Sequence, residues 1–225
     1  MQLTLHALKI TDEQFEQVVR ANPEWKFEQT AAGEIIIVPP TGGTSGEKNL
    51  NLSMQFGIWV EDNLELGRGF DSSTLFILPN SAKRMPNVSW VRRDRWDALT
   101  QKQRDGYVPL CPDFIIELRS PFRFGEEKFV SLKNACTNTN SGTNDLMKAD
   151  KFSSLTFTDS LEDLQAKMRD YMENGAHLGW LIAPQNSQVE VYRLRQEVEV
   201  LRSPTQLSGE DVLPGFVLRL ERIWN

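Results

Sequence analysis

The stretch that decides the fold is Cys111-Pro112-Asp113-Phe114-Ile115-Ile116-Glu117-Leu118-Arg119-Ser120-Pro121. Its apolar centre, bounded by prolines, predicts a β-strand that is buried on both faces at the centre of a sheet. Glu117 stands out in such a strand, because a buried carboxylate needs a cation, a metal ion or strong hydrogen-bond donors. Residues two apart in a strand face the same way, so Arg119 shares a face with Glu117. Two interpretations follow: a structural ion pair of Glu117 with Arg119 or a lysine, or a metal ligand at the end of the strand.

The size and composition fit one large α/β domain. The chain has 225 residues, of which 40% are hydrophobic, and a net charge of −6. This charge argues against a protein that coats DNA, but a nuclease is compatible with it, because its site needs carboxylates. Two cysteines, Cys111 and Cys136, give neither a disulfide framework nor a zinc pattern. With no apolar run of transmembrane length and no signal-peptide pattern at the start, the sequence predicts a cytoplasmic protein without membrane contact.

The first half of the chain alternates between helical and strand patterns. Capping residues near Thr11 predict a helix that ends at Asn22-Pro23, followed by a hairpin of strands at 25–30 and 34–38. A small polar loop, 41–46, precedes a helix predicted over 47–63, whose apolar residues are Leu50, Met54, Ile58 and Trp59. Glycine-rich loops before helices can bind phosphate, but this loop lacks the lysine and spacing of a P-loop. An ordinary connection is therefore the favoured interpretation of the loop.

The second half supplies the rest of a mixed sheet. One strand opens at 67–74 and continues through 75–78, and another covers 86–91, before the central strand. A helix starts near Thr158 or Ser160, carries an apolar stripe that includes Leu164 and Met168, and ends at Asn174-Gly175. A hairpin of strands at 178–183 and 188–193 follows, with a short strand at 198–201 and a last strand or turn at 213–220. These elements predict an α/β domain with mixed strand directions.

Several stretches together resemble the Uma-type endonuclease family of the PD-(D/E)XK nuclease superfamily. Each motif is short, but their order and spacing cover nearly the whole chain except residues 122–157. The matching stretches are Phe27-Glu28, Gly33-Glu34, Pro39-Pro40, Phe70-Asp71-Ser72-Ser73, Pro86-Asn87-Val88-Ser89-Trp90-Val91, Cys111 through Pro121, Leu164 through Tyr171, Asn174-Gly175, Gly179-Trp180-Leu181-Ile182, Val189-Glu190-Val191-Tyr192 and Leu213-Pro214-Gly215-Phe216.

The resemblance implies a fold, a reaction and a set of site residues. It implies a restriction-endonuclease-like mixed central sheet flanked by helices, forming a single domain over 1–225. It also implies Mg²⁺-dependent (or Mn²⁺-dependent) hydrolysis of DNA phosphodiester bonds, with DNA as the partner and a homodimer left open. Asn87 and Glu117 then stand at the metal-ligand positions, and Lys167 at the position of the family's helix-borne lysine. Arg119 stands where the superfamily usually has its lysine, and is a second candidate for the basic role.

This chain departs from the family pattern in two places. Asn87 replaces the metal-binding aspartate, so that an amide oxygen without charge stands where Mg²⁺ sites rely on a carboxylate. Residues 122–157 are expected to be an insertion that projects from the domain as a mobile excursion, because their centre is rich in Asn, Thr, Ser and Gly. Two hypotheses remain: a metal-dependent DNA endonuclease, active or weakened, and a catalytically inactive nuclease-like domain with a binding role or none. Asn87 favours the second.

The residues themselves also allow purely structural interpretations. Without the resemblance, Lys167 would be interpreted as a solvated lysine on a helix. Asp113 is best interpreted as the start of a strand, held by backbone donors.

Overall fold

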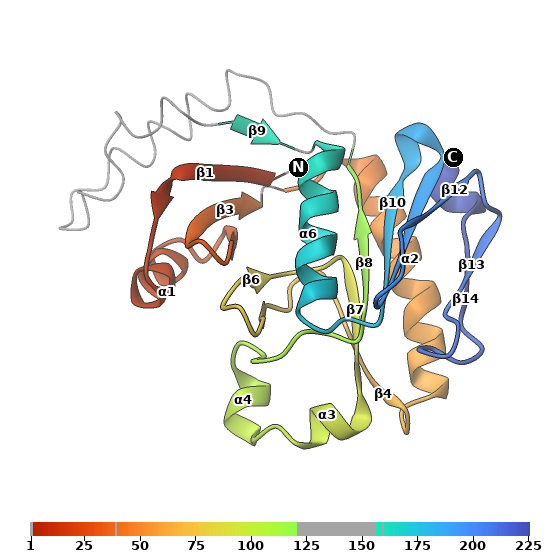
Figure 1. Cartoon of the computed structure of the whole chain (residues 1–225), viewed down its shortest axis with the longest axis horizontal. Coiled ribbons are helices and arrows are strands. Elements are labelled where there is room, and N and C mark those ends of the chain that lie inside the picture. Colours follow the sequence, from red (N-terminus) through yellow and green to blue (C-terminus); the bar gives the residue numbers. More distant parts are fainter. Residues whose placement is uncertain (1, 39, 121–155, 159) are drawn as a thin grey trace.

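The chain folds around two six-stranded sheets that meet beside one central helix, as the computed structural model shows (Figure 1). The structure describes residues 2–38, 40–120, 156–158 and 160–225. The predicted excursion at 122–157 therefore lies outside the described residues, apart from its last two residues. Thr156 and Phe157 belong to a short strand that pairs with the first strand of the chain.

Sheet 1 is formed mainly by the N-terminal part of the chain, with strand order β5-β6-β2-β3-β1-β9. The predicted hairpin is present as β2 and β3, which pair antiparallel from Lys26↔Val38 to Gln29↔Ile35. Strand β1 was not predicted, and it pairs antiparallel with β3 on the other side. The strands of sheet 1 are β1 (Gln2–Lys9), β2 (Lys26–Gln29), β3 (Glu34–Val38), β5 (Phe76–Ile77), β6 (Lys83–Arg84) and β9 (Thr156–Thr158).

Sheet 2 has the order β12-β11-β10-β8-β7-β4, and it places the predicted central strand at its centre. Strand β8 pairs antiparallel with β7 and parallel with β10, and all five of its residues are buried. The sheet is therefore mixed, as predicted. Its strands are β4 (Gly67–Phe70), β7 (Val88–Arg92), β8 (Phe114–Leu118), β10 (Leu178–Ala183), β11 (Gln188–Arg193) and β12 (Glu199–Arg202), and β13 (Gln206–Ser208) and β14 (Val217–Arg219) form a separate ribbon.

Helices cover both faces of sheet 2. Helix α6 lies on the face toward sheet 1, and α2 lies on the opposite face (Figure 1). No described helix is both long and apolar enough to cross a membrane. The helices are α1 (Asp12–Ala21), α2 (Gly43–Asp62), α3 (Arg93–Asp97), α4 (Gln101–Asp105), α6 (Leu161–Glu173), α7 (Glu221–Trp224) and the 3₁₀ turn η2 (Pro184–Asn186).

Close packing fixes α6 against the middle of sheet 2. Ser160 caps the N-terminus of the helix, since its side chain accepts a hydrogen bond from the Asp163 N–H, and the helix ends before Gly175, which has a φ of 103°. Gly179 on β10 has no side chain, and a Cβ there would lie 2.3 Å from Ile115 Cδ1 and 2.6 Å from Met168 Cε. A larger residue would force the ends of the Ile115 and Met168 side chains to move. The helix therefore lies close enough for its side chains to reach the central strand.

Helix α2 and its neighbourhood differ from the predictions. The helix begins at Gly43, so that most of the predicted polar loop 41–46 forms its first turn. Of the apolar residues predicted for this helix, only Trp59 is buried, whereas Leu50 is 69% exposed and Ile58 62% exposed. The helix is apolar on both sides, and Leu52, Phe56 and Trp59 are the residues that face sheet 2. The predicted strand at 67–78 is divided between β4 in sheet 2 and β5 in sheet 1.

Candidate functional site

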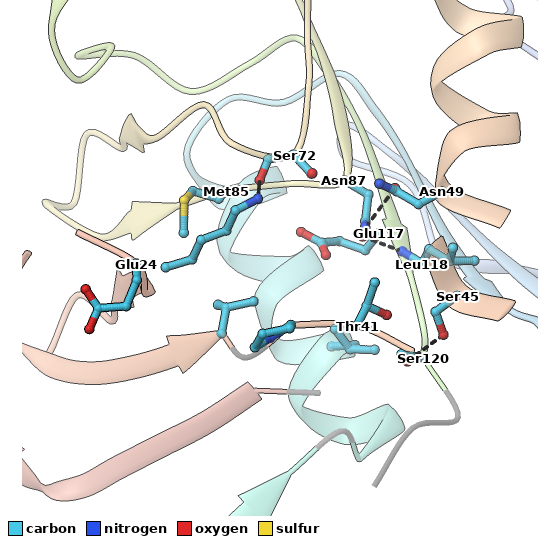
Figure 2. Close-up of a pocket in the computed structure, with 14 residues that line it drawn as sticks. Glu24, Thr41, Ser45, Asn49, Ser72, Met85, Asn87, Glu117, Leu118 and Ser120 are labelled. Carbon is cyan, nitrogen blue, oxygen red and sulfur yellow. Dashed lines mark hydrogen bonds between the residues drawn. The ribbon is translucent and has the colours of Figure 1, made fainter. Parts of the chain in front are cut away.

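A pocket of about 350 Å³ lies at the end of β8. It contains Glu117 from β8, Asn87 from just before β7, and polar residues from the first turns of α2, which Figure 2 shows on the other side of the chain leaving β8. Its wall on the α2 side includes a hydrogen bond between the hydroxyl groups of Ser45 and Ser120, whose oxygens are 2.7 Å apart. The pocket is lined by Glu24, Lys26, Val38, Pro40, Thr41, Ser45, Asn49, Ser72, Met85, Asn87, Glu117, Leu118, Ser120 and Leu164.

Glu117 is buried on β8 and paired with a lysine, one of the partners predicted for it. Its Oε1 lies 2.8 Å from Lys167 Nζ and accepts a hydrogen bond of 3.2 Å from the Tyr171 hydroxyl. Burial raises the pKa of Glu117, although the Lys167 ammonium acts in the opposite direction. These contacts both use Oε1, on the side of the carboxylate that faces helix α6.

Lys167 is a buried residue, so that its interpretation as a solvated helical lysine was wrong. Its Nζ donates to Glu28 Oε1 at 2.7 Å, lies 2.8 Å from Glu117 Oε1 and approaches the Met85 carbonyl oxygen at 3.5 Å. Burial disfavours the charged ammonium, but the two carboxylates outweigh this effect and raise the pKa of Lys167. An ammonium has three donors; two of them are taken up by the two carboxylates, and the Met85 carbonyl lies at the outer limit of hydrogen bonding for the third.

Glu28 and Arg84 extend this pair into a row of buried charges. Glu28, on β2, is fully buried, and its Oε1 also accepts from the Met85 N–H at 3.0 Å. Its Oε2 lies 3.5 Å from Arg84 Nη1, and Arg84 binds Asp170 Oδ2 through two donors, at 2.8 and 3.0 Å. Charges of opposite sign thus alternate from Glu117 through Lys167, Glu28 and Arg84 to Asp170. The row joins sheet 2, helix α6 and sheet 1.

Asn87 lies beside Glu117 with both ends of its amide engaged by the protein (Figure 2). Its Oδ1 accepts a hydrogen bond of 2.9 Å from the Leu118 N–H. Its Nδ2 donates to Asn49 Oδ1, on α2, at 3.1 Å. The side chain therefore ties the start of β7 to the end of β8 and to helix α2, and it brings no charge to the pocket.

Arg119 and Asp113 have different surroundings. Arg119 is not among the residues that line the pocket, and its backbone N–H donates to the Ile182 carbonyl at 2.8 Å. Asp113 Oδ2 accepts from the Arg92 N–H at 2.9 Å, and its Oδ1 lies 2.9 Å from Arg95 Nη1. Asp113 is thus held by a backbone donor, as predicted, and by an arginine in addition.

The β8 end of the pocket offers two candidate ligands for a magnesium ion, the Glu117 carboxylate and the Asn87 amide oxygen. Two carboxylates line the pocket, and Figure 2 shows that Glu24 points away from Glu117 at the far end. Glu117 already has a cation at Oε1, and the Asn87 oxygen already has a backbone donor. Among the described residues, no group of three or more His, Cys, Asp or Glu side chains is arranged to hold a metal ion. Mg²⁺ is commonly held by one or two carboxylates together with water and substrate phosphate, and Glu117 is the carboxylate at the β8 end of this pocket.

Sequence reasoning missed Glu28 and Arg84. Glu28 carried a usable signal, because a glutamate between apolar residues of a predicted strand raises the same question as Glu117. The spacing of Lys167, Asp170 and Tyr171 places them on neighbouring positions of one helix face. Glu28 and Lys167 are 139 residues apart, however, so that only the folded chain reveals their contact.

The comparisons with known proteins agree with this architecture. A crystal structure from Anabaena variabilis, described as a "putative nuclease belonging to DUF820", superposes with a TM-score of 0.60, covers 89% of this chain and 90% of that chain, and is 17% identical. This likeness shows the fold. No curated protein matches. The model of the Uma2 family, described as "Putative restriction endonuclease", matches residues 12–123 and 155–221 and leaves out 124–154. The chain therefore belongs to the Uma2 family.

Proposed function

We propose that this chain is a nuclease-like domain directed at DNA, in which metal-dependent cleavage of the phosphodiester bond is weak or lost. Family membership and the nuclease-like fold support the substrate class. Mg²⁺ or Mn²⁺ is the ion that this class of site would take, and Asn87 and Glu117 are the residues that would hold it. A cation there would bring positive charge to the scissile phosphate.

The observation that carries the proposal is the state of Asn87. Its oxygen and its nitrogen are both bonded to protein groups, and the side chain has no charge. Glu117 then supplies one negative charge where the family pattern supplies two. Weak binding of a divalent cation and poor cleavage follow from this deficit.

An inactive domain that only binds DNA is the second candidate. The pairing of Lys167 with Glu28 and Glu117 favours it, because the ammonium is held by two carboxylates within the protein. A lysine held in this way, and not among the residues that line the pocket, is poorly placed to orient a water molecule or a phosphate oxygen there.

Nicking of supercoiled plasmid in Mg²⁺ or Mn²⁺ tests the proposal. We expect little or no nicking by the unaltered chain, and a gain on the order of tenfold to a hundredfold for Asn87→Asp, which restores the second charge. Asn49→Asp is the matched control, because it adds the same charge on the α2 side of the same hydrogen bond. Equal gains from both variants would show that position 87 has no special role.

Two further variants complete the test. Glu117→Ala in the Asn87→Asp background should remove the gain. Strong nicking by the unaltered chain, abolished by Glu117→Ala, would contradict the impaired-site proposal. If the repaired chain binds labelled DNA without nicking it, the binding domain is the better interpretation. If it does neither, DNA is not the substrate.

A further inference from the structure

The Lys167 ammonium occupies a position that is built like a cation site. It lies 2.7 Å from Glu28 Oε1, 2.8 Å from Glu117 Oε1 and 3.5 Å from the Met85 carbonyl oxygen. Two carboxylates and a backbone carbonyl are the oxygen ligands that hard divalent cations take in proteins. The three groups come from three separate segments, β2, β8 and the chain after β6, which converge on one point.

The buried carboxylates of Glu28 and Glu117 need a positive charge between them. Among the described residues, Arg84 is the other cation bonded to this pair: it lies 3.5 Å from Glu28 Oε2 and is shared with Asp170. Tyr171 offers a neutral hydroxyl to Glu117 at 3.2 Å, and its ring lies 6.0 Å from the ammonium. If the ammonium were removed, two neighbouring buried carboxylates would share less than one positive charge, which is strongly unfavourable without another cation.

We infer that the Lys167 ammonium takes the place of a divalent cation between Glu28 and Glu117, and that Glu28 is the positioning residue that keeps it there. This interior position lies on the Oε1 side of Glu117 and does not involve Asn87. It is thus distinct from the metal position considered in the proposed function. The inference goes beyond that function and holds whether or not the chain cleaves DNA.

The test replaces the ammonium by a neutral side chain of similar length. We expect Lys167→Met to bind Mn²⁺ and Ca²⁺ on the order of tenfold or more tightly than the unaltered chain, measured by calorimetry and by the electron paramagnetic resonance of Mn²⁺. Ca²⁺ is the better spectroscopically silent probe, because its ligand distances of about 2.3–2.6 Å are closer to those of the ammonium than the Mg²⁺ distances of about 2.0–2.1 Å. Gln165→Met, on the same helix, is the control and should gain nothing.

Three double variants locate the gained site. Glu28→Gln added to Lys167→Met should abolish the gain, because it removes one of the two carboxylates. Glu190→Gln added to Lys167→Met should keep it, because Glu190 is another buried strand carboxylate, bonded to Gln165 of α6 at 2.7 Å rather than to Lys167. Asn87→Ala added to Lys167→Met should also keep it, which separates this position from the pocket.

Each possible result either supports or overturns the proposed cation position between Glu28 and Glu117. A gain that follows this pattern supports it, and so does a Lys167→Met chain that folds only when Mn²⁺ or Ca²⁺ is present. No gain by a folded variant overturns it, as does a gain that survives Glu28→Gln or is lost with Asn87→Ala. A Lys167→Met chain that stays unfolded even in millimolar Mn²⁺ also overturns it, because a prepared cation site would then have been filled.

Discussion

Two buried glutamates of sheet 2 face the same helix and are satisfied in different ways. Glu117 on β8 has a cation, Lys167, whereas Glu190 on β11 has neutral donors from Gln165, Gln188 and Tyr192, at 2.7, 3.2 and 2.7 Å. Burial alone therefore does not mark a carboxylate as a functional group. What distinguishes Glu117 is its charge partner and its place beside the pocket, where the strand ends.

The two glutamates should differ most in the stability lost when their partners on helix α6, Lys167 and Gln165, are replaced. We expect Lys167→Met, in the absence of metal, to lower the free energy of unfolding by about 3–5 kcal/mol, because it leaves two buried carboxylates without their shared cation. Gln165→Met should cost about 1–2 kcal/mol, because Glu190 keeps two donors. Urea unfolding of the two variants measures both values. Similar losses would mean that the charge of Lys167 adds little.

The variants Lys167→Met and Gln165→Met should also differ in how their stability changes in alkaline solution. The folded-state pKa of Lys167 is raised above its ordinary value of 10.5 by Glu117 and Glu28 against the effect of burial. Its stabilising contribution is therefore fully present below the ordinary pKa and is lost as the pH rises through the folded-state value. Unfolding free energies measured from neutral to alkaline pH should fall steeply for Gln165→Met and less steeply for Lys167→Met. Parallel curves would contradict the raised pKa.

Helix α6 carries both partners, so that displacing it should disturb both glutamates. Gly179→Ala places a methyl group against Ile115 and Met168, which should destabilise the chain by about 1–3 kcal/mol. The matched substitution Gly57→Ala adds a methyl group to the exposed face of α2, where a Cβ has no neighbour within 4 Å, and should be neutral or stabilising. Thermal unfolding compares the two. A tolerated Gly179→Ala would show that the ends of the Ile115 and Met168 side chains can move aside at no cost.

The smallest effects should come from the two tyrosine hydroxyls. Tyr171 donates to Glu117 at 3.2 Å and Tyr192 donates to Glu190 at 2.7 Å. Tyr192→Phe should cost about 1–2 kcal/mol, and Tyr171→Phe about 0.5–1 kcal/mol, since Glu117 retains its lysine. Chemical unfolding of both variants shows which of the two substitutions costs more stability. If Tyr171→Phe costs more, the hydroxyl, rather than the ammonium, is the main partner of Glu117.

The sequence predicted the parts of the site that are encoded locally. The apolar run around Glu117 indicated a central buried strand, and the capping residues and stripe of α6 indicated the helix that lies against it. A pair between Glu117 and a lysine was one of the two alternatives, and the structure identifies the lysine as Lys167. The resemblance had already placed both residues in one site.

Other features depend on contacts that no local pattern specifies. Glu28 reaches Lys167 from the other sheet, and Arg84 reaches Asp170 across 86 residues. Helix α2 carries apolar residues on two faces. The pattern of apolar residues therefore does not show which face is buried, and Leu50 and Ile58 remain exposed. Strand β1, by contrast, carried a usable local signal that was missed, because Leu3, Leu5 and Ala7 alternate with polar residues.

The central claim is that protein groups already satisfy this site: Asn87 lacks the second charge, and Lys167 holds the cation position behind Glu117. Titration of the unaltered chain with Mn²⁺ at neutral pH, followed by electron paramagnetic resonance, tests it most directly. The account predicts that equimolar Mn²⁺ at micromolar concentration remains in the free, hydrated form. Stoichiometric binding that disappears in Glu117→Ala would contradict it.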